Sequence, residues 1–236
     1  MLCDRLWEET QRLVNGCTLR KARVVGAQHD GQGSLQAAKL DDGTAVPAEA
    51  LLYACGPWTA NIMHGIKYHS AVVSTNRVLS QCVFFDGCGD PEVYVRPDST
   101  AFCTGFPEPA TIVTERPGEE AVLPDKIATI LESVRDASGS IGGALGTEPV
   151  VKQACYLPTT EDGVPIMGLL PDASAGGKGC YIATGHTCWG ILLGPASGES
   201  MADLIATGQS KHVKLHAFRP SRYKNIEPVA NLGIAE

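Results

Sequence analysis

The sequence predicts a mixed α/β (α+β) fold, in which a few helices accompany many short strands. Stretches near the start, middle and end of the chain carry apolar residues at helical spacing. Between them run short apolar or alternating stretches separated by Gly, Pro and Asp, a pattern typical of strands. With 236 residues, 44% of them hydrophobic and 19% charged, the chain can form one domain, or a domain with a small companion lobe, and is too apolar for disorder.

The first helix is predicted over residues 2–15. Its apolar face comprises Leu2, Leu6, Leu13 and Val14. Gly16 fits the position just past a helix end. The chain begins inside this helix, with no room for an N-cap, which suggests that an upstream portion is missing; a frayed terminal helix is the alternative.

Strands are predicted through the first half of the chain and a helix follows them. Expected strand regions are 17–28, 34–40, 50–55, 72–73, 78–79, 82–85, 93–95 and 101–103. The helix covers 124–135, with Pro124 in its first turn and Ile127, Ile130 and Val134 on one face.

The last third should return to a strand and a helix. We expect a Gly-rich connection at 138–146, a loop at 158–165 and a buried strand at 180–183. The final helix begins at Ile191 or Gly194, has Pro195 in its first turn and ends before Gly208.

Composition and charge exclude several classes of protein. A net charge of -7 and a pI near 5.4 disfavour a nucleic-acid or anionic-lipid surface, and no apolar stretch is long enough to span a membrane. The start of the chain is charged where a signal peptide would be apolar. Nine cysteines, with no C-x-x-C pair, predict reduced core thiols rather than disulfides or zinc. We therefore expect no metal site and an intracellular, reducing location such as the cytoplasm.

The stretch 183–199 is the best candidate for chemistry. A buried strand stops at Gly185, a polar and aromatic loop follows, and a helix then begins at a Gly/Pro-rich start. Unpaired N–H groups at a helix N-terminus bind anions or stabilise developing negative charge. The alternative is a glycine-rich turn that only packs on a sheet.

This stretch resembles the C-terminal flavin-contacting motif of the D-amino-acid oxidase/glycine oxidase/sarcosine oxidase superfamily of FAD-dependent oxidoreductases. The motif there runs A-T-G-H, W-G-I and P-A-T-G-E. The resemblance implies that this turn lies against the isoalloxazine ring. The residues it assigns to the flavin are Gly185, His186, Trp189, Gly190 and Ile191.

Further segments resemble the same family in the same order. Residues 51–59 are similar to its V-V-x-A-x-G-x-W-S motif, 94–98 with 104–105 to its substrate-domain pattern, and 155–168 to P-x-T-x-D-G-x-P-x-I-G. Residues 218–222 resemble its closing F-x-P-x-R. The additional cofactor-binding residues implied are Val24, Ala54, Gly56, Pro57 and Trp58.

The resemblance implies a division of the chain and a reaction. Residues 1–66 would be the remainder of a Rossmann-like FAD-binding lobe, 67–150 an antiparallel-sheet substrate lobe, 151–223 the return to the FAD-binding lobe, and 224–236 a tail. A small-molecule amine or amino acid would be oxidised by hydride transfer to FAD. Substrate-side candidates are Tyr94, Arg96 and Tyr156. Cys155 is either a covalent attachment point for the flavin or an ordinary buried thiol.

Two departures from the family pattern stand out. No G-x-G-x-x-G opens a helix after a strand, so the pyrophosphate-binding unit is missing and the chain is expected to be an N-terminally truncated part that binds FAD weakly or not at all. Leu157 stands where many members carry an arginine for the substrate carboxylate. These departures favour the alternative of a non-catalytic binding or regulatory module, or an inactive short isoform.

Overall fold

The structure, a computed structural model, describes residues 2–137, 148–171 and 178–228. The predicted connection at 138–146 and most of the predicted tail lie outside these residues. The helices are α1 (Leu2–Leu13), α2 (Pro124–Ala137) and α4 (Gly190–Thr207). The strands are β1 (Val24–His29), β2 (Leu35–Leu40), β3 (Ala45–Pro47), β4 (Leu51–Tyr53), β5 (His64–Ser74), β6 (Val83–Phe84), β7 (Glu92–Val95), β8 (Thr100–Gly105), β9 (Val151–Thr159), β10 (Ile166–Leu169) and β11 (Cys180–Thr184). The mixed fold class is confirmed.

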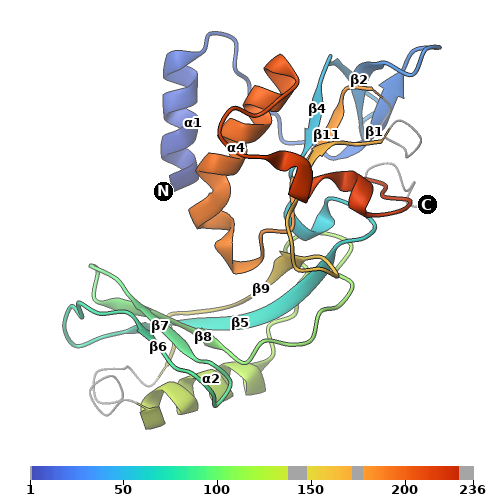
Figure 1. Cartoon of the computed structure of the whole chain (residues 1–236). Coiled ribbons are helices and arrows are strands. Elements are labelled where there is room, and N and C mark those ends of the chain that lie inside the picture. Colours follow the sequence, from blue (N-terminus) through green and yellow to red (C-terminus); the bar gives the residue numbers. More distant parts are fainter. Residues whose placement is uncertain (1, 138–147, 172–177, 229–236) are drawn as a thin grey trace.

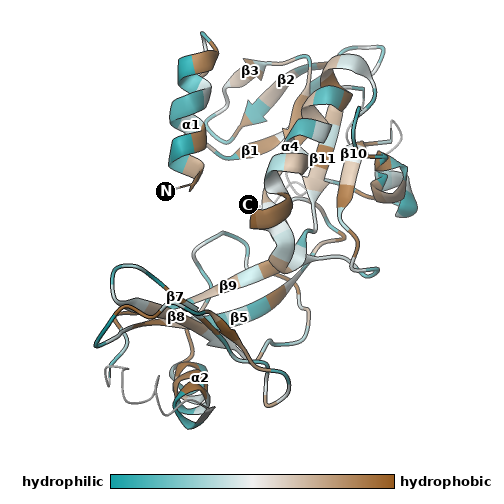
Figure 2. Cartoon of the chain, turned by 60° about the vertical axis from the view of Figure 1, so that its left-hand side comes forward, coloured by the Kyte–Doolittle hydropathy of each residue, from teal (hydrophilic) through white to brown (hydrophobic). Residues whose placement is uncertain are grey.

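One half of the molecule, the large-sheet lobe, consists of β5–β9 and α2 (Figure 1). Its antiparallel strands lie in the order β6-β7-β8-β5-β9. The odd-numbered side chains of β5, such as Ala71 and Val73, join Val93 in a core with Ile130 and Val134 of α2. Because α2 covers only this face, the opposite face of the sheet is turned toward the other half of the molecule (Figures 1 and 2).

The other half, the parallel-strand lobe, is built around the sheet β10-β11-β4, in which β4 runs parallel to β11. A meander of β1, β2 and β3 adjoins it through the bridge between Ser34 and Lys178. Its core includes Tyr53, Ile166 and Ile182. Because β4 and β11 are parallel neighbours, the chain leaves the ends of both strands at the same side of this core.

Both helices of the parallel-strand lobe expose apolar side chains. No described residue of α1 is buried, and only Ser200 and Met201 of α4 are. Ile191 is 82% and Leu192 70% exposed. Figure 2 shows the apolar first turns of α4 above the large sheet.

Several predicted elements differ from the observed ones. Residues 17–23 and 78–79 form no strand, because β-branched composition does not ensure a pairing partner. β9 continues through Pro158 to Thr159, where a loop was expected: Pro158 lies opposite Gly65 near the end of an edge strand, a position that tolerates a missing N–H.

Two further predictions were wrong. α4 begins at Gly190, so Pro195 lies inside the helix rather than in its first turn, and its missing N–H leaves one carbonyl without an intrahelical partner. Most cysteines were expected in the core, yet only Cys103 and Cys180 are buried. Apolar sequence neighbours alternate across a strand or around a turn, so they do not place the thiol itself inside.

None of the helices among the described residues is both long and apolar enough to cross a membrane.

Candidate functional site

Two turns lie next to each other at one edge of the parallel-strand lobe. Tyr53 of β4 pairs with Ile182 of the parallel strand β11, so both strands end at the same edge. The 3-10 turn η1 (Gly56–Trp58) follows β4, and η2 (Thr187–Trp189) follows β11. The Thr184 hydroxyl donates a 2.7 Å hydrogen bond to the Gly56 carbonyl and joins the turns. The carboxyl ends of adjacent parallel strands are where α/β sheets bind ligands.

Left-handed backbone conformations shape both turns. Gly56 has a φ of +58° and Gly185 a φ of +81°, a region in which only glycine avoids a steric cost. A Cβ on Gly185 would also lie 3.2 Å from the Thr160 side chain. Each turn therefore needs glycine where the strand ends.

The two turns face the large sheet. Both η1 and η2 contact β9. The Trp58 indole nitrogen donates to the Thr114 carbonyl at 2.7 Å, and its ring meets Tyr156 edge to face at 6.1 Å between centroids. Trp189 on the second turn is 58% exposed. Trp58 is thus fixed in place, whereas Trp189 leaves an apolar surface uncovered.

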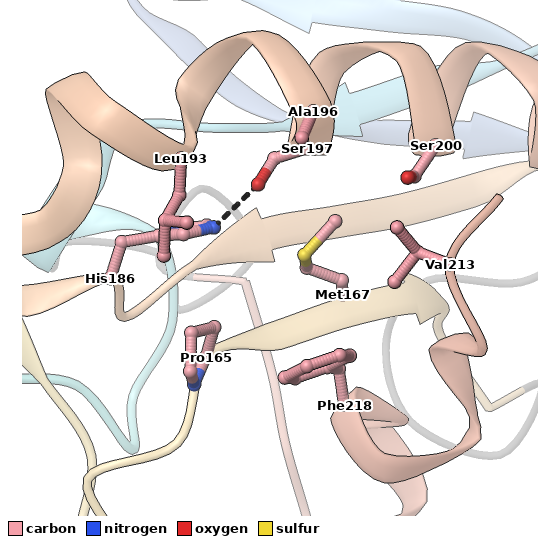
Figure 3. Close-up of a pocket in the computed structure, with 9 residues that line it drawn as sticks. All are labelled: Pro165, Met167, His186, Leu193, Ala196, Ser197, Ser200, Val213 and Phe218. Carbon is pink, nitrogen blue, oxygen red and sulfur yellow. Dashed lines mark hydrogen bonds between the residues drawn. The ribbon is translucent and has the colours of Figure 1, made fainter.

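His186 points away from the open side of its turn and toward α4 (Figure 3). Its Nε2 lies 2.9 Å from the Ser197 hydroxyl oxygen. Burial lowers the pKa of His186, so the neutral ring is favoured at neutral pH. The two residues border a cavity of about 120 Å³ lined by Pro165, Met167, His186, Leu193, Ala196, Ser197, Ser200, Val213 and Phe218. His186 therefore anchors the turn to the helix.

The N-terminal turn of α4 follows η2 directly. Trp189 at its N-cap makes no side-chain hydrogen bond to the helix. The N–H groups of a first helical turn have no intrahelical partner, and they form the positive end of the helix dipole. The arrangement can therefore stabilise negative charge beside Gly190 and Ile191.

The predicted substrate-side residues divide between the two faces of the large sheet. Tyr94 pairs with Phe102, which pairs with Val72, so all three lie on the open face. Arg96 extends the same face, with its guanidinium carbon 5.7 Å from the Phe102 ring centroid. Tyr156 pairs with Lys67 and so lies on the opposite face, beside Trp58.

The remaining predicted residues occupy different surroundings. Cys155 pairs with Tyr68 on the open face and is exposed; partial burial and then the charge of Glu120 raise the pKa of its thiol. Ala54 is exposed and Pro57 buried in the first turn. Val24 lies apart from both turns, at the start of β1.

Sequence reasoning missed four residues. Thr184 and Ser197 are hydroxyl residues that hold the two turns in place, and Tyr68 and Glu92 lie on the open face of the large sheet. Burial is the main cause of the raised pKa of both Tyr68 and Tyr94. The alternation Glu92-x-Tyr94-x-Arg96 could have indicated one shared face.

Within residues 2–137, 148–171 and 178–228, no group of three or more His, Cys, Asp or Glu is arranged to hold a metal ion.

Comparison with known families and proteins gives a consistent result. The family model of FAD dependent oxidoreductases matches residues 1–204. A Schizosaccharomyces pombe protein named as an oxidoreductase is 28% identical over 92% of the chain and 61% of its own length. Glycine oxidase of Bacillus subtilis is 34% identical over 48% of the chain and 30% of its own length.

The fold is also similar to solved structures. Glycine oxidase from Geobacillus kaustophilus aligns with a TM-score of 0.70 and 23% identity, over 88% of this chain and 54% of that one. L-proline dehydrogenase from P. horikoshii aligns with a TM-score of 0.67 and 17% identity, over 86% of this chain and 54% of that one. The chain thus spans about half the length of these structures, and less than two thirds of the curated relatives just named.

Proposed function

Because the chain belongs to the family of FAD-dependent oxidoreductases, we propose that it carries the ring-binding part of a flavoenzyme that oxidises a small amine or amino acid. The observation that carries the proposal is the pair of glycine turns joined by the hydrogen bond from Thr184 to Gly56. Both turns contact strand β9 of the large sheet, whose open side bears tyrosines. This arrangement suits a flat ring with a substrate beside it.

The residues at the turns fit the redox ring of FAD. The uncovered apolar side chains Trp189 and Ile191 offer surface that a flat ring would cover. The ring would lie against the turn residues assigned by sequence: Ala54, Gly56, Pro57, Trp58, Gly185, Trp189, Gly190 and Ile191. His186 would act by holding the second turn against α4, and Val24, at the start of β1, would not contact the ring. When bound, the flavin supplies the hydride acceptor.

The protein's own part is orientation and charge stabilisation. The N–H groups at the start of α4 would stabilise negative charge on a reduced ring. The bond between His186 and Ser197 holds the turn against that helix. Tyr94 and Arg96 on the open face would orient the substrate, and Tyr156 would support Trp58. The division at 66/67 and 150/151 remains part of this proposal.

Flavin attachment should be non-covalent. The thiolate is the nucleophilic form of cysteine, and the raised pKa of Cys155 favours the protonated thiol. Acid precipitation of the flavin-loaded chain should therefore leave the flavin in solution. Flavin retained in the pellet would instead identify Cys155 as the attachment point, to be checked with Cys155→Ser.

A non-catalytic module is the second candidate function. The observation that favours it is the absence of a G-x-G-x-x-G motif from the sequence, which removes the usual binding site of the diphosphate. The chain alone should therefore bind FAD weakly, as an N-terminally truncated part of a longer enzyme or an inactive short form would.

One experiment separates the two candidates. The purified chain is titrated with FAD, and the change in the flavin absorption bands is measured. Sarcosine, glycine and D-alanine are then added without oxygen. We expect weak but saturable binding, and bleaching of bound flavin by at least one of the amines. Saturable binding without bleaching by any amine would favour the non-catalytic module, and no change in the bands at high FAD would contradict the proposal.

A further inference from the structure

The open face of the large sheet carries an ordered set of side chains. Cross-strand pairing aligns Phe84 with Glu92, Glu92 with Thr104, and Thr104 with Ser70. The next row on the same face contains Tyr94 and Phe102. Since paired residues of antiparallel strands lie on the same face, these side chains share one surface.

A carboxylate is held within this surface by a phenol. The Tyr94 hydroxyl donates a 2.7 Å hydrogen bond to Glu92 Oε2, and Glu92 is half-buried. Burial, and then this bond, raise the pKa of the Tyr94 hydroxyl, so it remains a donor at neutral pH. Glu92 Oε1 makes no hydrogen bond to any described residue, and an oxygen of this kind can accept a bond from a ligand.

Aromatic rings adjoin the carboxylate. Tyr94 meets Phe84 edge to face at 5.3 Å and Phe102 at 5.9 Å between centroids. A carboxylate beside aromatic faces attracts cations, through the opposite charge and through the negative face of the ring. The surface is therefore suited to an ammonium group.

The second turn contacts the large sheet. Strand β9 contacts η2, and Cys155 of β9 pairs with Tyr68 on the open face. The second turn therefore adjoins the same sheet that carries Glu92, on the β9 side. A ligand bound at Glu92 would share this sheet with the turn assigned to the flavin.

The same face offers little to an anion near Glu92. Arg96, the residue that follows β7, is four residues from Glu92, about 13 Å along the chain, and already lies over Phe102. The row next to Tyr68 and Cys155 pairs Ile66 with Leu157 and is apolar. The charged group that this part of the surface selects is therefore a cation.

We propose that Glu92 and Tyr94 bind the ammonium group of the substrate, and that the substrate class is a small cationic amine held by its nitrogen rather than by a carboxylate. This inference rests on the proposed function and adds its substrate class. Glu92 is assigned as a specificity-determining residue, and Tyr94 orients its carboxylate.

Binding of matched probes tests the assignment. The chain, with FAD added, is titrated calorimetrically with dimethylammonium chloride, sodium acetate and sarcosine; the first keeps the secondary amine of sarcosine without its carboxylate. The proteins compared are the unmodified chain, Glu92→Gln, Tyr94→Phe and the control Glu132→Gln. Glu132 is exposed on α2, on the other side of the sheet, and its substitution changes the net charge equally.

We expect dimethylammonium to bind the unmodified chain and Glu132→Gln alike. Its dissociation constant should rise about tenfold in Glu92→Gln, as the loss of a charge-assisted contact predicts, and about threefold in Tyr94→Phe. Acetate should bind none of the proteins measurably. Circular dichroism and the thermal midpoint of each variant, compared with the unmodified chain, verify that it is folded.

The outcomes separate this inference from the proposed function. Equal dimethylammonium binding in Glu92→Gln and the unmodified chain, tighter binding of acetate, or no dimethylammonium binding at all would overturn the inference. The flavin absorption bands, recorded in the same samples, report on the proposed function independently. Unchanged bands with Glu92-dependent binding of dimethylammonium would contradict the flavin proposal and leave the amine site supported.

Discussion

The two lobes differ in how completely they bury their apolar side chains. In the large-sheet lobe, α2 places Ile127, Ile130 and Val134 in one core with the sheet, each at most 3% exposed. In the parallel-strand lobe, α1 buries none of its described residues, and α4 leaves Ile191 and Leu192 largely exposed. The first lobe is stabilised by its own packing, whereas the second keeps apolar surface available for a ligand or another polypeptide segment.

The exposed surface lies next to the site. α4 starts at the second glycine turn, and its first residues are among the most exposed apolar side chains. Under the proposed function, the lobe that would bind the flavin carries the uncovered apolar surface, and the lobe that would contribute the substrate-side groups carries the well-packed core. Substitutions in the two lobes should therefore affect different properties.

The largest effect on stability is expected for a substitution in the core of the large-sheet lobe. Ile130→Ala should reduce the free energy of unfolding by about 2–5 kcal/mol, because it removes a fully buried side chain and leaves a cavity. Leu192→Ala, at an exposed position of α4, should change it by less than about 0.5 kcal/mol. Urea denaturation followed by circular dichroism measures both. Equal losses would mean that the two lobes are packed alike.

A second effect concerns the segment that closes the parallel-strand lobe. Asp162, after β9, accepts hydrogen bonds from Arg222 and Tyr223 near the end of the described chain. Burial opposes ionisation, but the bonds from Arg222 and Tyr223 outweigh it and lower the pKa of Asp162. Asp162→Asn should therefore cost about 1–2 kcal/mol at neutral pH, after allowance for its partial exposure.

The sign of the pH dependence follows from the lowered pKa. The stabilisation by Asp162 is complete above the usual Asp pKa of about 4, and it is lost as the pH falls toward the lower folded value. The difference between the chain and Asp162→Asn should thus shrink in acid. Chemical denaturation at a series of pH values measures it, with the neighbouring Glu161→Gln as the control. A difference that persists unchanged in acid would show that the charge of Asp162 is not involved.

The sequence predicted the local elements better than their pairing. The spacing of Ile127, Ile130 and Val134 gave the buried face of α2, and the left-handed Gly208 does end α4. Periodicity could not show that β9 pairs with β5 over nine residues, since such pairing joins segments far apart in the chain.

Only those residues of the candidate site that belong to recognisable sequence motifs were predictable. Gly56 and Gly185 were identifiable, and the structure brings their turns together through Thr184. The position of Tyr156 on the face opposite Tyr94 depends on the register of β9, because a shift of one residue would move the Tyr156 side chain to the other face of the sheet. The bond from His186 to Ser197 joins a turn to a helix 11 residues later, and nothing in the local pattern marks Ser197.

A comparison of two glycine substitutions should separate a role in FAD binding from the cost of backbone strain alone, and its effect on stability is smaller. Gly185→Ala and Gly208→Ala each place a Cβ at a φ near +81° or +82°, which should cost about 1–2 kcal/mol in either case. Only at Gly185 does the new Cβ meet a neighbour, Thr160 at 3.2 Å, and the Gly208 Cβ would meet nothing within 4 Å. Chemical denaturation should thus show that both substitutions lower the free energy of unfolding by similar amounts, with a slightly larger loss for Gly185→Ala. FAD titration should find weaker binding for Gly185→Ala alone; equal weakening in both variants would assign the effect to stability.

The smallest effect on stability is expected at the uncovered helix start. Ile191→Glu should change the free energy of unfolding by less than about 0.5 kcal/mol, because the side chain is 82% exposed. It should nevertheless weaken FAD binding, since it places a negative charge beside the helix N-terminus and removes apolar surface from the turn. Leu13→Glu on α1, at 66% exposure, makes the same change in charge away from the turns. If both variants bind FAD as the unmodified chain does, the exposed start of α4 does not contact the flavin, and its apolar surface must serve another contact.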